Sequence, residues 1–215
     1  MKKHLNLTTL SAQTCIIACI TDVVLLFVFG EYFPGYSQLK DTISHLGSTT
    51  SPVSTLISTW SVLLGIIFIA FGIAFKNEFA NKGKISGLAS WLIILYGIGE
   101  GIGSGIFKAD QIANLPTTSG IIHEIFGAIG VISVLILPLI APKVMPKEEK
   151  ASFQLISKIV FVLGFILLLL FVLRFSNYKA SFLFIYKGLW QRLFLFNIYF
   201  YLSTTAIIMI RRQRN

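Results

Sequence analysis

Apolar runs decide the fold of this chain, and a clear example is residues 159–173, which have the sequence IVFVLGFILLLLFVL. No polar or charged side chain interrupts this run, which lies inside a longer apolar stretch at 153–175. That stretch meets the length of about 20 mostly apolar residues that a membrane-spanning helix needs. The whole chain has 55% hydrophobic and only 13% charged residues, against about 25% charged residues in typical soluble proteins. This composition excludes most soluble enzymes, nucleic-acid-binding domains and disordered proteins.

Five further stretches pass the same test. We therefore predict an all-α polytopic membrane protein with a single six-helix transmembrane domain over residues 1–215. The short breaks between the stretches make sequential helices antiparallel neighbours. The predicted helices are 12–30, 53–75, 85–107, 119–141, 153–175 and 189–210.

The distribution of Lys and Arg residues predicts the orientation in the membrane. With the amino terminus inside, twelve of the 18 Lys and Arg residues fall on the inner side and six on the outer side. Cytoplasmic loops carry such an excess of positive charge. Both termini are therefore predicted to be cytoplasmic, and the net charge of +9 indicates topology rather than a nucleic-acid partner.

The longest predicted loop, residues 31–51, lies outside on this topology. Within it Leu39, Ile43 and Leu46 have helical spacing with polar residues between them. We expect residues 36–46 to contain a short helix that lies at the membrane surface or caps the bundle.

Two acidic residues fall inside predicted helices. Asp22 lies midway along the first helix and Glu100 lies in the third. Ionisable groups at membrane depth are costly and mark candidate sites. Each acid either belongs to a proton or ion pathway, or is protonated or hydrogen-bonded to a neighbouring Ser, Thr or Tyr.

Glycine occupies every second position from residue 97 to residue 105, around Glu100. The pattern superficially resembles a dinucleotide-binding loop, but no strand precedes it. Gly97, Gly101 and Gly105 instead form a small-residue stripe on one helix face, with Gly99 and Gly103 beside it. Such stripes let a second helix approach closely in lipid, so we interpret the pattern as helix packing.

A cluster of polar side chains gathers at the predicted outer face. We expect it to form an outward-facing pocket that binds a lipid headgroup or small ligand, or that has a structural role. The hypothesis places three residues at the floor of the pocket and three in the loop that covers it. The floor residues are Asp110, His123 and Arg192, and the covering residues are Asp41, Ser44 and His45.

Two other functions stay open for this cluster. One is a metal-dependent hydrolase that acts on a lipid or amide bond, with Asp110, His123 and Ser44 as catalytic candidates and Asp110 and His123 as zinc ligands. The sequence lacks the H-E-x-x-H spacing of such sites, so no metal or other cofactor is expected outside this alternative. The other is a small transporter or channel subunit.

Several of these fragments together resemble the domain of unknown function 998 family of six-helix bacterial and archaeal membrane proteins. The resemblance implies a six-helix bundle and places Asp41, Ser44, Asp110, His123 and Arg192 at motif positions, without implying a reaction. Lys108 stands where the family often has proline. A more distant likeness is to alkaline-ceramidase-like hydrolases, which use Ser, Asp and His around an intramembrane zinc. The fragments are Pro34-Gly35-Tyr36-Ser37, Asp41-Thr42-Ile43-Ser44, Leu46-Gly47, Gly105-Ile106-Phe107, Asp110, Gly120, His123, Gly188-Leu189 and Gln191-Arg192.

The expected location is the bacterial cytoplasmic (inner) membrane, where the chain would cross several times. The expected partners are membrane lipids, with a second membrane protein or a second copy of the chain as further candidates. No nucleic-acid partner is expected, because the basic residues at 211–214 follow a predicted helix directly and suit contact with anionic lipid.

Overall fold

The computed structural model describes residues 6–112, 115–173 and 182–214. Within these ranges six helices are long and apolar enough to cross a membrane, which confirms the prediction of an all-α polytopic bundle. The third crossing is one continuous span in which the α-helix changes to a π-helix. The helices are α1 (Leu7–Glu31), α3 (Ser54–Glu78), α4 (Lys84–Tyr96) with η2 (Gly97–Gly103) and α5 (Ser104–Ile106), α6 (Thr118–Ile140), α7 (Lys147–Val172) and α9 (Lys187–Arg212).

Shorter elements connect the long helices. The first loop contains α2 (Ile43–Leu46), which covers only the last part of the helical pattern noted at 36–46. Strands β1 (Gln111–Ile112) and β2 (Leu115–Pro116) pair antiparallel, with Gln111 opposite Pro116. Other connections contain η1 (Ala80–Lys82), η3 (Ala141–Lys143) and α8 (Phe182–Ile185).

The observed helices extend beyond the apolar stretches where capping and charge allow it. Helix α1 starts at Leu7 because the Asn6 side chain accepts hydrogen bonds from the amides of Thr8 and Thr9. Helix α7 starts six residues before its apolar stretch, after Pro146, and has Glu148 in its first turn, where an acidic group interacts favourably with the helix dipole. The apolar stretches alone therefore place the starts of both helices several residues too late.

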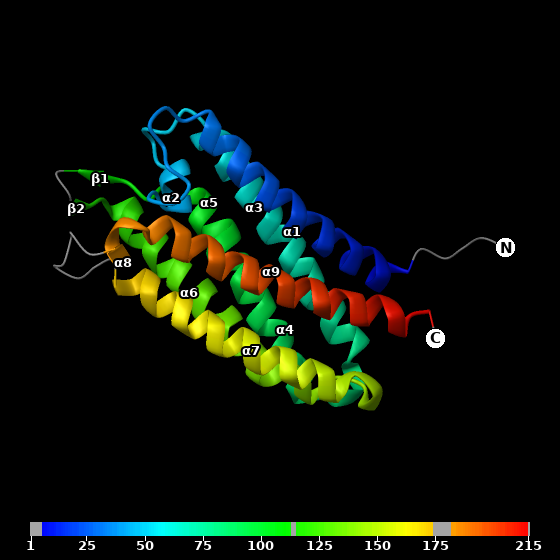
Figure 1. Ribbon diagram of the computed structural model, residues 1–215. Helices are drawn as coiled ribbons and strands as arrows, with labels where there is room; N and C mark the ends of the chain where they lie inside the picture. The colour runs from blue at the N-terminus through cyan, green and yellow to red at the C-terminus, as the bar shows by residue number, and fades with distance from the viewer. Residues whose placement is uncertain (1–5, 113–114, 174–181, 215) are drawn as a thin grey trace.

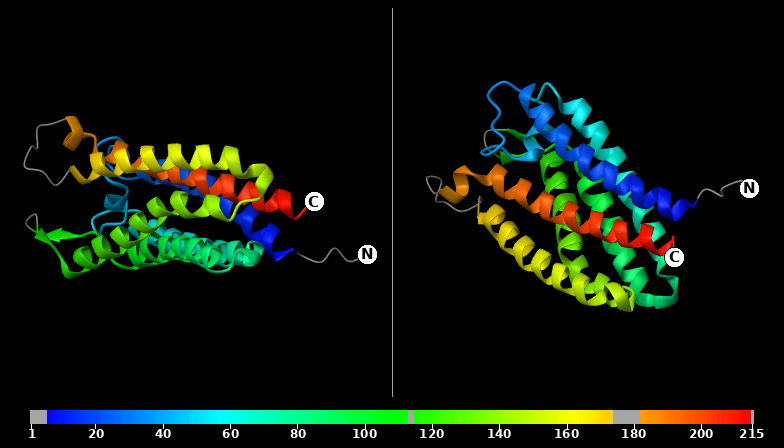
Figure 2. Two further views of the ribbon diagram at one scale, coloured as in Figure 1. Left: turned by 90° about the horizontal axis from the view of Figure 1, so that it is seen from below. Right: turned by 45° about the vertical axis from the view of Figure 1, so that its right-hand side comes forward.

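The six long helices form two layers. One layer contains α3, the α4–η2–α5 span and α6, and the other contains α1, α9 and α7, with the α4–η2–α5 span and α9 as the middle helices. Contacts of α1 with α3 and of α6 with α7 join the layers at their edges. Figure 2 shows α7 and α9 on one side of the green and cyan helices, and Figure 1 shows the antiparallel course of the chain.

The two ends of the bundle differ in character. The described parts of both termini lie at one end, here called the termini end, while the first loop, α2 and the β1–β2 hairpin lie at the other, here called the loop end (Figure 1). At the termini end Asn6 Nδ2 donates to Gln213 Oε1 at 2.6 Å, and Arg212 Nε donates to Glu78 Oε1 at 2.8 Å. These contacts join α1, α3 and α9.

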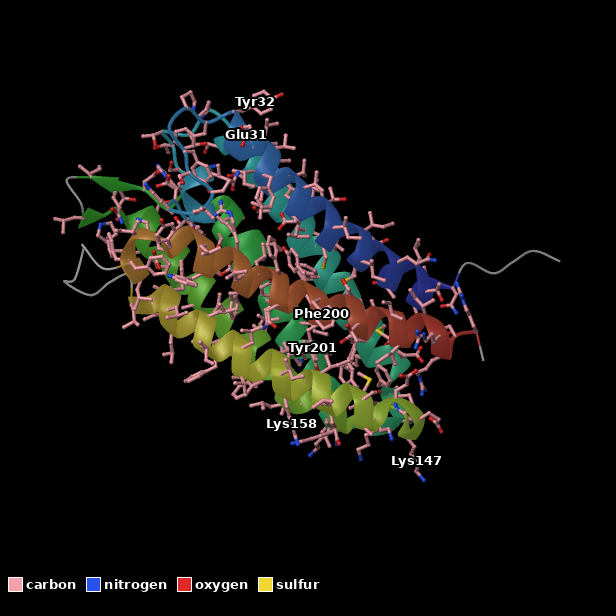
Figure 3. All side chains as sticks on the ribbon, viewed as in Figure 1. Glu31, Tyr32, Lys147, Lys158, Phe200 and Tyr201 are labelled. Atoms are coloured by element: carbon pink, nitrogen blue, oxygen red, sulfur yellow. The ribbon has the colours of Figure 1, made fainter. Side chains whose placement is uncertain are left out.

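Side chains along one helix separate into those that face the core and those that face outward. On α9 Tyr201 is fully buried while its neighbour Phe200 is 57% exposed, and Figure 3 labels both. Lys158 is exposed on α7, where its long side chain lets the ammonium reach toward the membrane surface. Many large apolar side chains are exposed along the long helices, as suits contact with lipid. Lys2, Lys3, Arg174 and Lys179, which entered the charge count, lie outside the described residues.

Candidate functional site

A cavity of about 120 Å³ lies between the two layers, at the loop end of the bundle. It has room for several water molecules or a small ligand group. Its loop end is lined by Ile43 and Ser44 of α2 and by Gly47, which follows α2. We call it the interlayer cavity, and its polar lining includes Asp22, Ser44, Ser58, Tyr96, Glu100, Ser104, His123, Gln191 and Tyr199.

Asp22 lies deepest among the acidic groups of the cavity. It lies nine residues before the end of α1, about 14 Å along the helix from the loop end. Its side chain is buried, and its two carboxylate oxygens accept hydrogen bonds from Trp60 Nε1 at 2.7 Å and from the Tyr199 hydroxyl at 2.8 Å. Tyr96 lies beside this group, and Phe68 packs against both tyrosine rings. Asp22 therefore joins α1, α3 and α9.

Glu100 lies on the π-helix η2. The glycines of η2 let it pack closely between α3 and α6. A Cβ on Gly101 would lie 2.3 Å from Gly65 Cα of α3, and a Cβ on Gly99 would lie 2.4 Å from the Phe126 carbonyl oxygen of α6. Helix α6 likewise has Gly130 beside the backbone of Glu100. The alternating glycines thus permit backbone contact on two sides, which agrees with the packing interpretation. π-Helical turns are frequent at functional sites.

His123 on α6 and Ser104 on α5 both line the cavity. His123 Nδ1 lies 2.9 Å from the Phe107 carbonyl oxygen. A carbonyl only accepts, so we assign the hydrogen to Nδ1, which leaves Nε2 as an acceptor in the neutral ring. The hydroxyl oxygen of Ser104 is buried and has no hydrogen-bond partner among the described residues. A buried hydroxyl without a partner costs about 1–3 kcal/mol, unless water or a ligand in the cavity supplies one.

Lys108 follows α5 by two residues and contacts Ser58, which lines the cavity. Its Nζ lies 3.0 Å from Ser54 Oγ and 3.3 Å from the Ser54 carbonyl oxygen, and it makes a very short contact with Ser58 Oγ. Burial lowers the pKa of Lys108 from its usual 10.5, and nearby Asp110 acts in the opposite direction. Lys108 therefore ties the start of α3 to the end of the third crossing.

Arg192 fastens the first loop to α9. It is 3% exposed, and its guanidinium donates to Gln38 Oε1 at 3.0 Å, to the Asp41 carbonyl at 2.9 Å, to the Gly188 carbonyl at 3.0 Å and to the Tyr36 hydroxyl. Burial raises the pKa of Tyr36, although the adjacent guanidinium partly opposes this. The Tyr36 hydroxyl in turn donates to the Thr42 carbonyl at 3.1 Å. We call this group the loop clasp.

Gln191 strengthens the attachment of the loop. Its Oε1 accepts a hydrogen bond from the Ile43 amide at 2.7 Å, at the start of α2. Two neighbouring residues of α9 thus hold the segment that covers the cavity.

The remaining polar residues of the predicted outer cluster form local pairs. Asp41 Oδ2 accepts from the Ser37 amide at 2.8 Å, and Asp41 Oδ1 lies 3.7 Å from His45 Nδ1. Asp110 Oδ1 accepts from the Thr49 amide at 2.8 Å. These contacts fix the first loop and attach it to the residue just before β1.

The structure therefore distributes the six predicted pocket residues over three places. Ser44 and His123 line the interlayer cavity, whereas Arg192 belongs to the loop clasp. Asp41 and Asp110 hold backbone amides of the loop, and His45 lies beside the Asp41 carboxylate. Asp110 and His123, the zinc ligands of the hydrolase alternative, contact different backbone groups. In the described ranges no three His, Cys, Asp or Glu side chains come close enough to hold a metal ion together.

Sequence reasoning missed several residues that shape the site. Tyr96 precedes Glu100 by four residues, so both share a face of the third crossing, and this spacing was a usable signal. Tyr199 and Trp60 are partners of Asp22 only through tertiary contact. Ser58 and Lys108 come together across 50 residues, and no local pattern indicates their contact.

Comparison with known protein families places the chain in one of them. The family profile described as protein of unknown function (DUF998) matches residues 16–208. This range covers all six crossings except the start of α1 and the end of α9. The chain belongs to the DUF998 family. All the cavity-lining residues of this DUF998 protein lie within the matched range. No curated protein and no solved structure matches the sequence.

Proposed function

We infer that this DUF998 protein binds a lipid headgroup or a small polar ligand in the interlayer cavity. The observation that carries the proposal is the buried Ser104 hydroxyl, which lines the cavity and has no hydrogen-bond partner among the described residues. His123 Nε2 adds an acceptor nearby. Binding sites typically combine apolar walls with a few convergent polar groups, and apolar side chains such as Phe68 and Phe194 complete this wall.

The ligand would enter from the predicted outer side of a bacterial cytoplasmic membrane. The positive-inside count supports this sidedness, because it places the loop end outside. Helix α2 then covers the entrance, and the loop clasp sets how readily the covering segment moves. The bacterial origin of the membrane is part of the proposal.

Native mass spectrometry of the protein in nanodiscs tests ligand binding. The probes are phosphatidylethanolamine, phosphatidylglycerol and cardiolipin, each added singly, together with any species that copurifies. We expect Ser104→Val and His123→Leu to weaken retention of the bound species by about tenfold, which corresponds to one lost hydrogen bond of about 1.4 kcal/mol.

Ser133→Ala is the matched control. Ser133 is a buried serine of α6 whose hydroxyl donates to the Ile129 carbonyl at 2.7 Å, away from the cavity. Retention should be unchanged in this variant. Equal retention of every probe by all three variants would indicate binding at the outer lipid-facing surface and would overturn the cavity proposal.

A further inference from the structure

The contact between Ser58 and Lys108 differs from the other serine contacts of the bundle. Serines inside helices commonly donate to the carbonyl four residues earlier. Ser61, Ser133 and Ser157 all follow this rule, with distances of 2.7–2.8 Å. Ser58 does not; the carbonyl of Ser54, its partner by this rule, accepts a hydrogen bond from Lys108 Nζ. The Ser58 hydroxyl contacts Lys108 Nζ instead.

The three oxygens around Lys108 Nζ match the three N–H donors of a lysine ammonium, and a neutral amine can keep the same three contacts. A neutral amine has two N–H donors and one lone pair. The Ser54 carbonyl can only accept, so it takes one N–H, and Ser54 Oγ takes the second. In that neutral form the lone pair would accept the hydrogen of the Ser58 hydroxyl, which reverses the hydrogen bond that the ammonium donates to Ser58 Oγ. Burial lowers the pKa of Lys108 and so eases loss of the proton that this form requires.

Ser58 also lies where a substrate would reach it. It lines the interlayer cavity, four residues into α3 and about 6 Å along the helix from the loop end. Ester and amide bonds of outer-leaflet amphiphiles lie at a comparable shallow depth, between headgroup and chains. A hydroxyl activated by an adjacent base is the arrangement that nucleophilic catalysis requires, and serine–lysine pairs perform it in known enzymes.

We propose that Ser58 is the nucleophile and Lys108 the general base of a metal-independent acyl hydrolase that acts on an ester or amide of an amphiphile in the interlayer cavity. The proposal rests on the proposed function, since the substrate must first enter the cavity. It differs from the metal-dependent hydrolase considered from the sequence, because the nucleophile is a serine side chain and not a metal-activated water.

The chemistry balances in two steps. In the first, Ser58 Oγ bonds to the acyl carbon while its proton moves to Lys108 Nζ. The bond to the leaving alcohol or amine then breaks, and Lys108 returns the proton to the leaving group. In the second step water attacks the acyl-serine, with Lys108 taking a proton from water and returning it to Ser58 Oγ. The products are a carboxylic acid and an alcohol or amine.

A long-chain alkyl fluorophosphonate tests the nucleophile directly in the full-length protein in nanodiscs. Ser58 Oγ would bond to phosphorus, fluoride would leave, and the serine proton would pass to Lys108. Peptide mass spectrometry should locate the adduct on Ser58, and Ser58→Ala should not be labelled. Ser61→Ala is the matched control, because Ser61 is one turn further along α3 and its hydroxyl is already used by the Ile57 carbonyl. Its labelling should be unchanged.

Two lysine variants test the base. Lys108→Met and Lys108→Arg should each slow labelling by about 100-fold or more, the size of a general-base contribution. Arginine keeps the positive charge and donors but does not deprotonate, so it separates a base from a structural cation. The labelling rate of the unmodified protein should rise with pH through the lowered pKa of Lys108, and this rise should disappear in both variants. Thermal unfolding checks that each variant is folded.

The outcomes separate the two proposals. The hydrolysed probe, an alkyl phosphonate without fluoride, reports entry into the cavity by thermal stabilisation that Ser104→Val reduces. Entry without an adduct on Ser58 overturns the acyl hydrolase and leaves the binding function standing. If the probe neither enters the cavity nor forms an adduct on Ser58, the binding function and the acyl hydrolase are both overturned. Labelling of Ser58 that Lys108→Arg leaves unchanged overturns the role of Lys108 as base.

Discussion

Arg192 illustrates how one buried side chain holds the covering loop in place. Its fork of N–H donors serves four acceptors at once, and lysine does not reproduce that planar geometry. We expect Arg192→Lys to lower the free energy of unfolding by roughly 2–3 kcal/mol, because buried acceptors lose charged hydrogen bonds. Thermal unfolding in detergent measures the loss, and limited proteolysis should cut the first loop faster.

Arg211→Lys provides the control for that substitution. The Arg211 side chain is 65% exposed and lies 3.6 Å from Glu149, and exposed ion pairs of this kind contribute little. Stability and loop cleavage should therefore match the unmodified protein. Equal effects of the two substitutions would contradict the loop clasp.

At the scale of elements, the π-helix η2 depends on its glycines for close packing. Gly99→Ala and Gly101→Ala each place a Cβ within 2.4 Å of a neighbouring helix backbone. We expect each to destabilise the protein by roughly 1–3 kcal/mol, the usual cost of overpacking. Thermal unfolding of the purified variants is the measurement.

Gly87→Ala tests whether glycine content or glycine position matters in the same crossing. A Cβ on Gly87 would meet nothing within 4 Å. This substitution should be neutral or should stabilise by up to about 1 kcal/mol, as alanine favours helix. Destabilisation of all three variants alike would argue against the tight contacts of η2.

For the whole molecule, the charge distribution predicts one orientation. Carboxy-terminal fusions should behave as cytoplasmic, giving fluorescence with a green fluorescent reporter and no activity with alkaline phosphatase. Thr49→Cys, at an exposed position of the loop end, should react with a membrane-impermeant maleimide in intact cells. Cys15 and Cys19 are buried and should give no background. An external carboxy terminus would reverse the predicted sidedness.

The fold was predictable from the sequence to a much greater extent than the site. Apolar length alone locates six crossings, because each crossing must satisfy its backbone internally as a helix. Side-chain partners depend on tertiary distance, which a single sequence does not encode locally. Thus Asp22 stood out as an acid in an apolar helix, whereas its donors Trp60 and Tyr199 did not. Lys108 likewise gave no sign of its contact with Ser58.

The hydrogen bonds of Asp22 also constrain the order in which the protein is assembled. Helix α1 is synthesised first and carries this carboxyl into lipid before either donor exists, at a cost of about 2.5–3.5 kcal/mol for an acid at mid-membrane. Trp60 follows 38 residues after Asp22, so a hairpin of α1 and α3 already contains one of the two donors. Tyr199 follows 177 residues after Asp22. Among the six described crossings, the last to be synthesised therefore completes the hydrogen-bonding of the first.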